Sequence, residues 1–394
     1  MKLEQRVGTV VSLGTTQTLS WASSYYLPAM LAVPMARDLG VSVPTVFAAF
    51  SVALIVSAIV GPLAGRSIDR YGGRLVLVST NVMFAAGIGG LALADGIAGL
   101  FAAWVLIGVA MGAGLYDAAF STLVRLYGND SRGAITGITL IAGFASTVGW
   151  PLSAWLETQV GWRGACVTWA ALHLVLGIPL NLLLPSTPSS LPTRLESPDG
   201  TPPHTGTPKS APQSATILLS FVFAATWFTS TAMAAHLPRL LQEAGATLTA
   251  AVAASALVGP AQVMARVLEF GLLRRMHPLL SAQLAALAHP VGAGILAWAG
   301  APAAAAFTIL HGAGNGILTI AKGTLPLALF GPYGYGARQG LLMVPARVAQ
   351  AFAPYLFGLL VDRWGSGALW VSSLIGLAAF GALLWLARRV AGMS

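Results

Sequence analysis

The sequence predicts an all-α polytopic membrane protein with twelve transmembrane helices arranged in two six-helix, pseudo-symmetric halves. Of its 394 residues, 56% are hydrophobic and only 8% are charged, whereas soluble domains carry roughly 25% charged residues. Apolar stretches long enough to cross ~30 Å of hydrocarbon recur along the whole chain. Lipid offers backbone groups no partner, and these stretches are too long and unbroken for barrel strands, so each is expected to be a helix.

Twelve apolar stretches are the predicted spans, taken in chain order. In the first half they cover residues 8–35, 45–65, 75–94, 98–123, 134–156 and 164–184. In the second half they cover residues 215–237, 247–270, 279–299, 303–324, 339–360 and 368–387. The first stretch is longer than the apolar core of a signal peptide and lacks a convincing cleavage site, so we keep it as a span.

A polar segment over residues 185–213 separates the two groups of spans. It is rich in Pro, Ser and Thr and contains no apolar run, so it is predicted to be a flexible cytoplasmic linker. We therefore expect an N-terminal six-helix bundle over residues 1–184 and a C-terminal one over residues 214–394.

The two predicted halves also repeat each other. Trp21 corresponds to Trp227, and Pro151 to Pro354, at an offset of roughly 200 residues. Paired halves with a binding site between them at the midplane are typical of secondary transporters.

The distribution of positive charge predicts the orientation in the membrane. The chain carries 21 Lys and Arg against 12 Asp and Glu. With the N-terminus inside, only Arg37, Arg163, Arg239 and Arg363 fall on outer segments, and most other cations fall on cytoplasmic ones. This asymmetry follows the positive-inside rule, so both termini are predicted to be cytoplasmic. We expect the bacterial inner (cell) membrane as the location, and no nucleic-acid partner.

A motif rich in glycine and charge follows the second span. Residues 61–74 read Gly-Pro-Leu-Ala-Gly-Arg-Ser-Ile-Asp-Arg-Tyr-Gly-Gly-Arg. This resembles the signature between helices 2 and 3 of the major facilitator superfamily. The resemblance implies alternating access and a latch that holds the halves together on the cytoplasmic side in the outward-open state. Its expected members are Gly61, Asp69, Arg70, Gly72 and Arg74.

The eighth span resembles that of a narrower group. Residues 262–266 read Gln-Val-Met-Ala-Arg. This is similar to a segment of the monocarboxylate and oxalate/formate-type carriers, in which an acidic residue precedes the arginine by four positions. Arg347 in the eleventh span is similar in placement to a second cation that oxalate-type carriers use for a dianion. Gln262 stands where the proton-coupled members have a carboxylate, so their proton coupling is not carried over.

Charges inside the spans predict an anion site. A charge at the bilayer centre costs at least ~2.5–3.5 kcal/mol, so such residues usually face a cavity or a partner. Counted from the nearest loops, Arg266, Arg347 and Asp117 each lie roughly 12–14 Å from the cytoplasmic interface. Because arginine binds a carboxylate through two parallel bonds, we expect these three spans to surround a cavity for a small organic anion.

Further side chains complete the predicted site. Aromatic rings of the first and fourth spans would supply apolar walls and hydroxyl donors. The predicted substrate-binding residues are Arg266, Arg347, Asp117, Tyr25, Tyr26, Trp21, Tyr116, Gln262, His311 and Asn315. The candidates for carrying a coupling proton are Asp117, Glu269 and His311.

Two alternatives stay open at this point. The charges could be permanent pairs: Glu269, three residues after Arg266, would neutralise it, and Asp117 would pair with either arginine. Lys322 is expected near the cytoplasmic end of the tenth span, reaching to the interface. A second functional hypothesis is a proton-driven efflux pump that binds cationic or lipophilic compounds through Asp117.

The sequence argues against an enzyme. Carboxylates and histidines show no metal-ligand spacing, Cys166 is the single cysteine, and no phosphate-binding loop ending in Lys-Ser/Thr is present. We expect no metal, no cofactor and no ATP-driven step. The expected partners are a small organic anion, the lipid bilayer and protons as a candidate coupling ion, with the carrier acting as a monomer.

Overall fold

The computed structural model describes residues 3–186, 213–272 and 276–391, and all regular elements within these ranges are helices. The N-terminal set consists of α1 (Leu3–Ser23), α2 (Leu27–Asp38), α3 (Val43–Tyr71), α4 (Gly73–Ala92), α5 (Gly96–Gly114), α6 (Tyr116–Tyr127), η1 (Gly128–Ser131), α7 (Arg132–Ala142), α8 (Ala145–Leu172), η2 (His173–Gly177) and α9 (Ile178–Leu182). The C-terminal set consists of α10 (Gln213–Glu243), α11 (Leu248–Ser255), α12 (Val258–Gly271), α13 (Pro278–Ala299), η4 (Ala301–Ala303), α14 (Ala304–Phe330), α15 (Tyr335–Trp364), η5 (Gly365–Gly367) and α16 (Ala368–Ala391).

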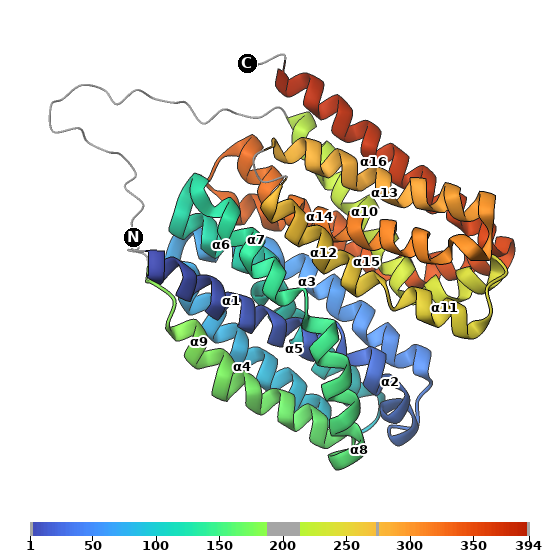
Figure 1. Ribbon diagram of the computed structural model, residues 1–394. Coiled ribbons are helices and arrows are strands. Elements are labelled where there is room, and N and C mark those ends of the chain that lie inside the picture. Colours follow the sequence, from blue (N-terminus) through green and yellow to red (C-terminus); the bar gives the residue numbers. More distant parts are fainter. Residues whose placement is uncertain (1–2, 187–212, 273–275, 392–394) are drawn as a thin grey trace, which may run out of the picture.

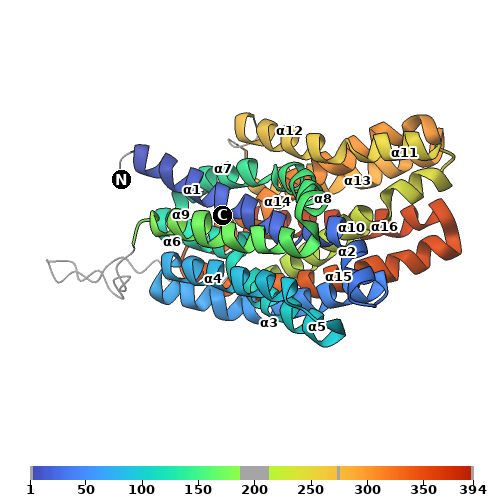
Figure 2. The same cartoon turned by 90° about the horizontal axis from the view of Figure 1, so that it is seen from below.

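The two sets lie side by side, the N-terminal set in blue to green and the C-terminal set in yellow to red (Figure 1). Turned by 90°, the long helices again run along one common direction, as a bundle that crosses a single bilayer requires (Figure 2). The predicted linker over residues 185–213 falls almost wholly on residues 187–212, which lie outside the described part of the chain.

The described helices form twelve crossings, the predicted number. Within the described ranges, eight helical stretches are long and apolar enough to span a membrane. Two of them, Gly96–Leu182 with 87 residues and Tyr335–Arg389 with 55, are too long for one crossing. The first makes three crossings, because Gly161 breaks α8 with a φ of 72°, and the second makes two. The pair α1–α2 supplies the remaining crossing.

Four crossings expected as single helices are interrupted. Turns at residues 143–144 and 256–257 interrupt the stretches expected over residues 134–156 and 247–270, and the other two breaks lie in the first and fourth crossings. A turn over residues 24–26 separates α1 from α2, and Pro28, which needs no N–H partner, stands in the first turn of α2. The extended backbone of Leu115 separates α5 from α6. The expectation of one continuous helix over residues 8–35, and of another over residues 98–123, is therefore wrong. The second break puts Asp117 in the first turn of α6.

The two sets approach most closely along α3 and α15, where glycines face each other. A Cβ atom added to Gly65 would lie 2.0 Å from the carbonyl oxygen of Gly336. One added to Gly340 would lie 2.6 Å from the carbonyl oxygen of Gly61. Real Cβ atoms do not approach oxygen so closely, so this backbone contact depends on glycine at these positions.

Asp69, the acidic member of the expected latch, bonds directly from one set to the other. Its carboxylate accepts hydrogen bonds from the backbone N–H of Gly336 at 2.9 Å and of Ala337 at 2.8 Å. These groups begin α15, where a helix leaves its N–H groups without partners. Arg125 of α6 donates to the carbonyl of Asp69. Gly72 ends α3 with a φ of 86°, which a side chain would disfavour.

The two arginines of the expected latch are placed differently. The Cζ atom of Arg70 lies 5.1 Å from the ring centroid of Tyr71, so this contact stays within α3. Arg74 is half-buried in the first turn of α4. Of the charged latch residues, Asp69 therefore makes the hydrogen bonds that join the two sets.

Candidate functional site

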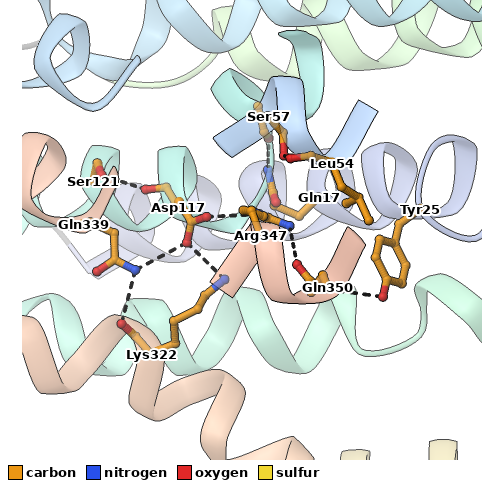
Figure 3. Close-up of polar contacts among 11 residues, drawn as sticks. Gln17, Tyr25, Leu54, Ser57, Asp117, Ser121, Lys322, Gln339, Arg347 and Gln350 are labelled. Atoms are coloured by element: carbon orange, nitrogen blue, oxygen red, sulfur yellow. Dashed lines mark hydrogen bonds and ion pairs between the residues drawn. The ribbon is translucent and has the colours of Figure 1, made fainter. Parts of the chain in front are cut away.

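Asp117 is the centre of a charged cluster between the two sets of helices. Its Oδ1 lies 3.0 Å from Nζ of Lys322, and its Oδ2 lies 3.0 Å from Nη2 of Arg347. Gln339 Nε2 donates a hydrogen bond to Oδ1 at 3.3 Å. Asp117 belongs to α6, whereas its three partners belong to α14 and α15, so the cluster joins the N-terminal to the C-terminal set (Figure 3).

The cations of this cluster are out of contact with solvent. The side chain of Lys322 is 1% exposed and that of Arg347 is 3% exposed. Removing an ion from water costs several kcal/mol even after the protein relaxes, so each of these cations needs a counter-ion. Asp117 supplies one negative charge for the two of them, which leaves one positive charge in excess.

Arg347 also connects Asp117 to the aromatic side chains of α1 and the turn that follows it. Its Nη1 donates to Oε1 of Gln350 at 3.3 Å. Gln350 Nε2 donates in turn to the Tyr25 hydroxyl and to Thr231 Oγ1, both at 3.4 Å. Figure 3 shows this chain of contacts running from Asp117 through Arg347 and Gln350 to Tyr25.

Five aromatic rings form one group, called here the aromatic cluster: Trp21, Tyr25, Tyr26, Tyr116 and Trp227. The ring centroid of Trp21 lies 5.0 Å from that of Tyr116, 5.2 Å from that of Tyr25 and 6.3 Å from that of Tyr26. The ring of Trp227 stacks on Trp21 at 6.4 Å. Within the described residues, the buried indole N–H of Trp21 has no hydrogen-bond acceptor.

Lys322 contacts the aromatic cluster directly. Its Nζ lies 5.0 Å from the ring centroid of Trp227, and 5.6 Å from those of Tyr116 and Phe120. These are cation–π distances, and such contacts stabilise a desolvated ammonium group. The ammonium is thus held by aromatic faces as well as by Asp117.

Arg266 is buried, being 4% exposed, but its recorded partners are neutral. Nη1 donates to the Thr139 carbonyl at 2.9 Å, and Nε to the Gly316 carbonyl at 3.4 Å. Nη2 donates to Oε1 of Gln262 at 3.4 Å. Among the residues that the structure describes, no carboxylate lies within ion-pair distance of this guanidinium.

Arg266 lies at the contact between the two sets, because its Nη1 bonds the Thr139 carbonyl of α7. Arg347 reaches Tyr25 of the aromatic cluster through Gln350. Arg347 and Lys322 thus border the aromatic cluster and share the carboxylate of Asp117, and Arg266 is a third buried cation between the two sets. Within this group, positive charge exceeds negative charge by two.

Glu269 does not neutralise Arg266, so that pairing is wrong. Its Oε1 lies 3.0 Å from Nη2 of Arg132, at the start of α7 in the other set. Arg132 also donates to the Met276 carbonyl at 2.8 Å. A spacing of three residues puts Arg266 and Glu269 on related faces of one helix, but it carries no information about a partner from another helix.

Lys322 does not reach the membrane interface, so that expectation is also wrong. The helix α14 continues to Phe330 instead of ending at residue 324, and Lys322 therefore lies deeper in the bundle than the apolar run suggested. Gln339 and Gln350 were missed altogether, because an amide in an apolar helix has no distinctive spacing. The positive charge of Lys322 within an apolar run was the one sequence feature that could have placed it in the cluster.

His311 and Asn315 lie in a separate cavity of the C-terminal set. This small cavity of about 40 Å³ is lined by residues of α10, α13, α14 and α16. His311 Nδ1 lies 3.0 Å from Nδ1 of His289, and His289 Nε2 lies 2.9 Å from Oγ of Ser372. The His311 ring thus bonds a side chain of α13 and does not contact Asp117.

Two curated relatives match part of the chain. An uncharacterized 38 kDa protein of Thermoproteus tenax is 34% identical over 157 residues, 39% of this chain and 40% of that protein. An oxalate:formate antiporter of Oxalobacter formigenes is 28% identical over 154 residues, 39% of this chain and 36% of that protein. The chain therefore matches about two fifths of the length of these relatives.

Solved structures of transporters share the fold over nearly the whole chain. The human organic anion transporter MFSD10 is 18% identical with a TM-score of 0.70, covering 97% of this chain and 100% of that one. The proton:xylose symporter XylE is 13% identical with a TM-score of 0.75, covering 96% of this chain and 95% of that one.

The comparison with protein families covers most of the chain. The model described as Major Facilitator Superfamily matches residues 13–305. The twelve crossings agree with the fold of the structural neighbours, and those neighbours are transporters and not enzymes. The chain belongs to the major facilitator superfamily and is an integral membrane transporter.

Proposed function

We propose that this transporter is a secondary carrier for a small organic anion, a carboxylate, which it moves by alternating access. The observation that carries the proposal is the environment of Arg266, a buried guanidinium whose recorded acceptors are all neutral. A buried charge without a counter-ion is costly, and a bound carboxylate would supply the missing negative charge. The similarity to an oxalate:formate antiporter supports the same substrate class.

The proposed binding surface is the aromatic cluster together with the cations that border it. Arg266 would offer two parallel N–H groups to a carboxylate. The unpaired indole N–H of Trp21 is a second donor. Tyr25 and Tyr26 are half-buried, whereas Trp21 and Tyr116 are buried, so we place the approach of a small molecule on the tyrosine side of the cluster.

We place both termini and the linker in the cytoplasm, with six-helix halves over residues 1–184 and 214–394 that rock about the site. The Asp69 cap on α15 and the Arg132–Glu269 pair both join the two sets near the ends of helices that we place on the cytoplasmic side. Bonds that close this side support an outward-facing state, as expected of the latch.

Proton coupling has less support than exchange against a second anion. Asp117 is engaged by two cations and Glu269 by Arg132, so either carboxylate would have to give up an ion pair in order to carry a proton. The efflux-pump alternative loses support for the same reason, because both Asp117 oxygens are already occupied. A transported cation would have to compete with Lys322 and Arg347 for this carboxylate.

Exchange in proteoliposomes tests the proposal. Vesicles loaded with unlabelled oxalate should take up labelled oxalate, and Arg266→Gln should reduce that uptake about tenfold or more, the effect of losing a charge-assisted bond of ~1.5–3 kcal/mol. Arg239→Gln is the matched control, since Arg239 is an exposed arginine paired with Asp362 at 2.7 Å. Unchanged uptake by the Arg266 variant, for oxalate and a panel of other carboxylates, would contradict the proposal.

A further inference from the structure

We infer that Asp117 is an internal stand-in for a substrate carboxylate, which displaces it from Lys322 and Arg347, and that the preferred substrate is a dianion. This inference rests on the proposed anion transport. The geometry of Asp117 motivates it: each carboxylate oxygen lies 3.0 Å from a different cation. A bound substrate carboxylate would make the same two contacts.

Asp117 is the accessible member of its cluster. Its side chain is 13% exposed, whereas those of Lys322 and Arg347 are 1% and 3% exposed. We therefore place the approach of a ligand on the side of this carboxylate. Displacement of Asp117 is the way in which such a ligand gains direct contact with both cations.

The two cations have further contacts that keep them in place when Asp117 leaves. Lys322 remains against the rings of Trp227 and Tyr116, and Arg347 remains bonded to Gln350 on its own helix. Both cations are therefore preorganised for an incoming carboxylate, which lowers the ordering cost of binding.

Asp117 belongs to the other set of helices, so its ion pairs also tie the sets together. These pairs must separate or rotate when the two sets move relative to each other. A substrate that replaces Asp117 would release this connection at the moment of binding. This links occupancy of the site to the freedom of the two sets to move.

The net charge of the buried ionic groups favours a dianionic substrate. Arg266, Arg347 and Lys322 carry three positive charges against the single negative charge of Asp117. A dianion brings the sum to zero, whereas a monoanion leaves one charge uncompensated when the site closes and excludes water. Because an uncompensated buried charge is costly, the carrier should close around oxalate more readily than around formate.

Binding measurements on the purified, detergent-solubilised carrier test the inference, with oxalate and formate as probes. If Asp117 occupies the cation pair most of the time, the apparent Kd for oxalate equals the intrinsic Kd divided by the small fraction of carriers in which the pair is free. Asp117→Asn should therefore bind oxalate about tenfold more tightly. Asp362→Asn is the matched control, because it removes an exposed carboxylate that is also paired with an arginine. Its affinity should equal that of the wild type.

A second variant keeps the test valid if Asp117→Asn fails to fold. Gln339→Leu removes a neutral donor that holds Asp117 at 3.3 Å and leaves every charge in place. It should tighten oxalate binding severalfold, whereas a merely structural role of Asp117 predicts unchanged or weaker binding. In vesicles, Asp117→Asn should retain oxalate exchange but lose net uptake, since the empty carrier then buries an additional uncompensated charge.

The possible outcomes separate the two proposals. Weaker or unchanged oxalate binding in both variants, with normal binding by the wild type, overturns the stand-in role of Asp117. Formate binding as tight as oxalate binding overturns the dianion preference. Absence of binding and exchange by the wild type, for these probes and other carboxylates, contradicts the proposed function itself.

Discussion

Arg347 and Arg266 are both buried arginines of the C-terminal set, and they differ in what balances their charge. Arg347 lies 3.0 Å from a carboxylate of the other set, whereas Arg266 donates only to two carbonyls and an amide. Burial alone therefore does not tell how a charge in a membrane bundle is balanced before a ligand binds. The partner decides: a balanced charge stabilises the empty protein, and an unbalanced one awaits a counter-ion.

The largest expected effect is a difference in stability between Arg347→Gln and Arg266→Gln. Removing Arg347 takes one of its two cation contacts from Asp117, and losing a hydrogen bond to a charged group costs ~1.5–3 kcal/mol. Removing Arg266 leaves neutral acceptors behind and should destabilise the empty protein far less. Thermal unfolding in detergent would measure both variants against the exposed control Arg239→Gln. Equal loss of stability in the two variants would mean that the environments of the arginines do not differ as described.

Gln262→Glu should remove the difference between the two arginines. Gln262 Oε1 already lies 3.4 Å from Nη2 of Arg266, so the substitution places a carboxylate within reach of that guanidinium. The variant should unfold at a higher temperature and bind oxalate about tenfold more weakly, because a paired arginine is no longer free for a carboxylate. Gln283→Glu on α13 is a control, since Gln283 is a half-buried amide that bonds the Leu383 carbonyl. Undiminished oxalate binding by Gln262→Glu would argue against Arg266 as a ligand.

Hydropathy and depth counting predicted the helices and the charges, but not which charges pair. Counting residues from the loops put Asp117 and Arg347 at one depth, and they are in contact. The same count grouped Arg266 with them, yet its partners are different. Depth along a helix follows from the rise per residue, whereas pairing depends on the rotation and tilt of each helix, which an apolar sequence specifies weakly.

The sequence also did not predict the breaks within the first and fourth crossings. Hydropathy identifies an apolar run but carries no information about its backbone conformation. It therefore could not predict the turn over residues 24–26 or the extended backbone of Leu115. These two breaks place Tyr25, Tyr26 and Asp117 in the site. The residues of a transporter site that are hardest to predict are therefore those positioned by departures from regular helix.

The smallest expected effect is a change in the KM for oxalate. It compares two buried tryptophans, one that we propose contacts the ligand and one that packs within the fold. Trp21 and Trp104 are both buried with an unpaired indole N–H among the described residues. Trp21 belongs to the aromatic cluster, whereas Trp104 packs against Phe50 at 5.4 Å. Trp21→Phe keeps an aromatic ring and removes the donor, so it should raise the KM for oxalate about threefold to tenfold, the value of one hydrogen bond. Trp104→Phe should leave the KM unchanged. An equal rise in both variants would show that the indole N–H of Trp21 does not contact the substrate, and would leave Arg266 as the donor that distinguishes this surface from the rest of the bundle.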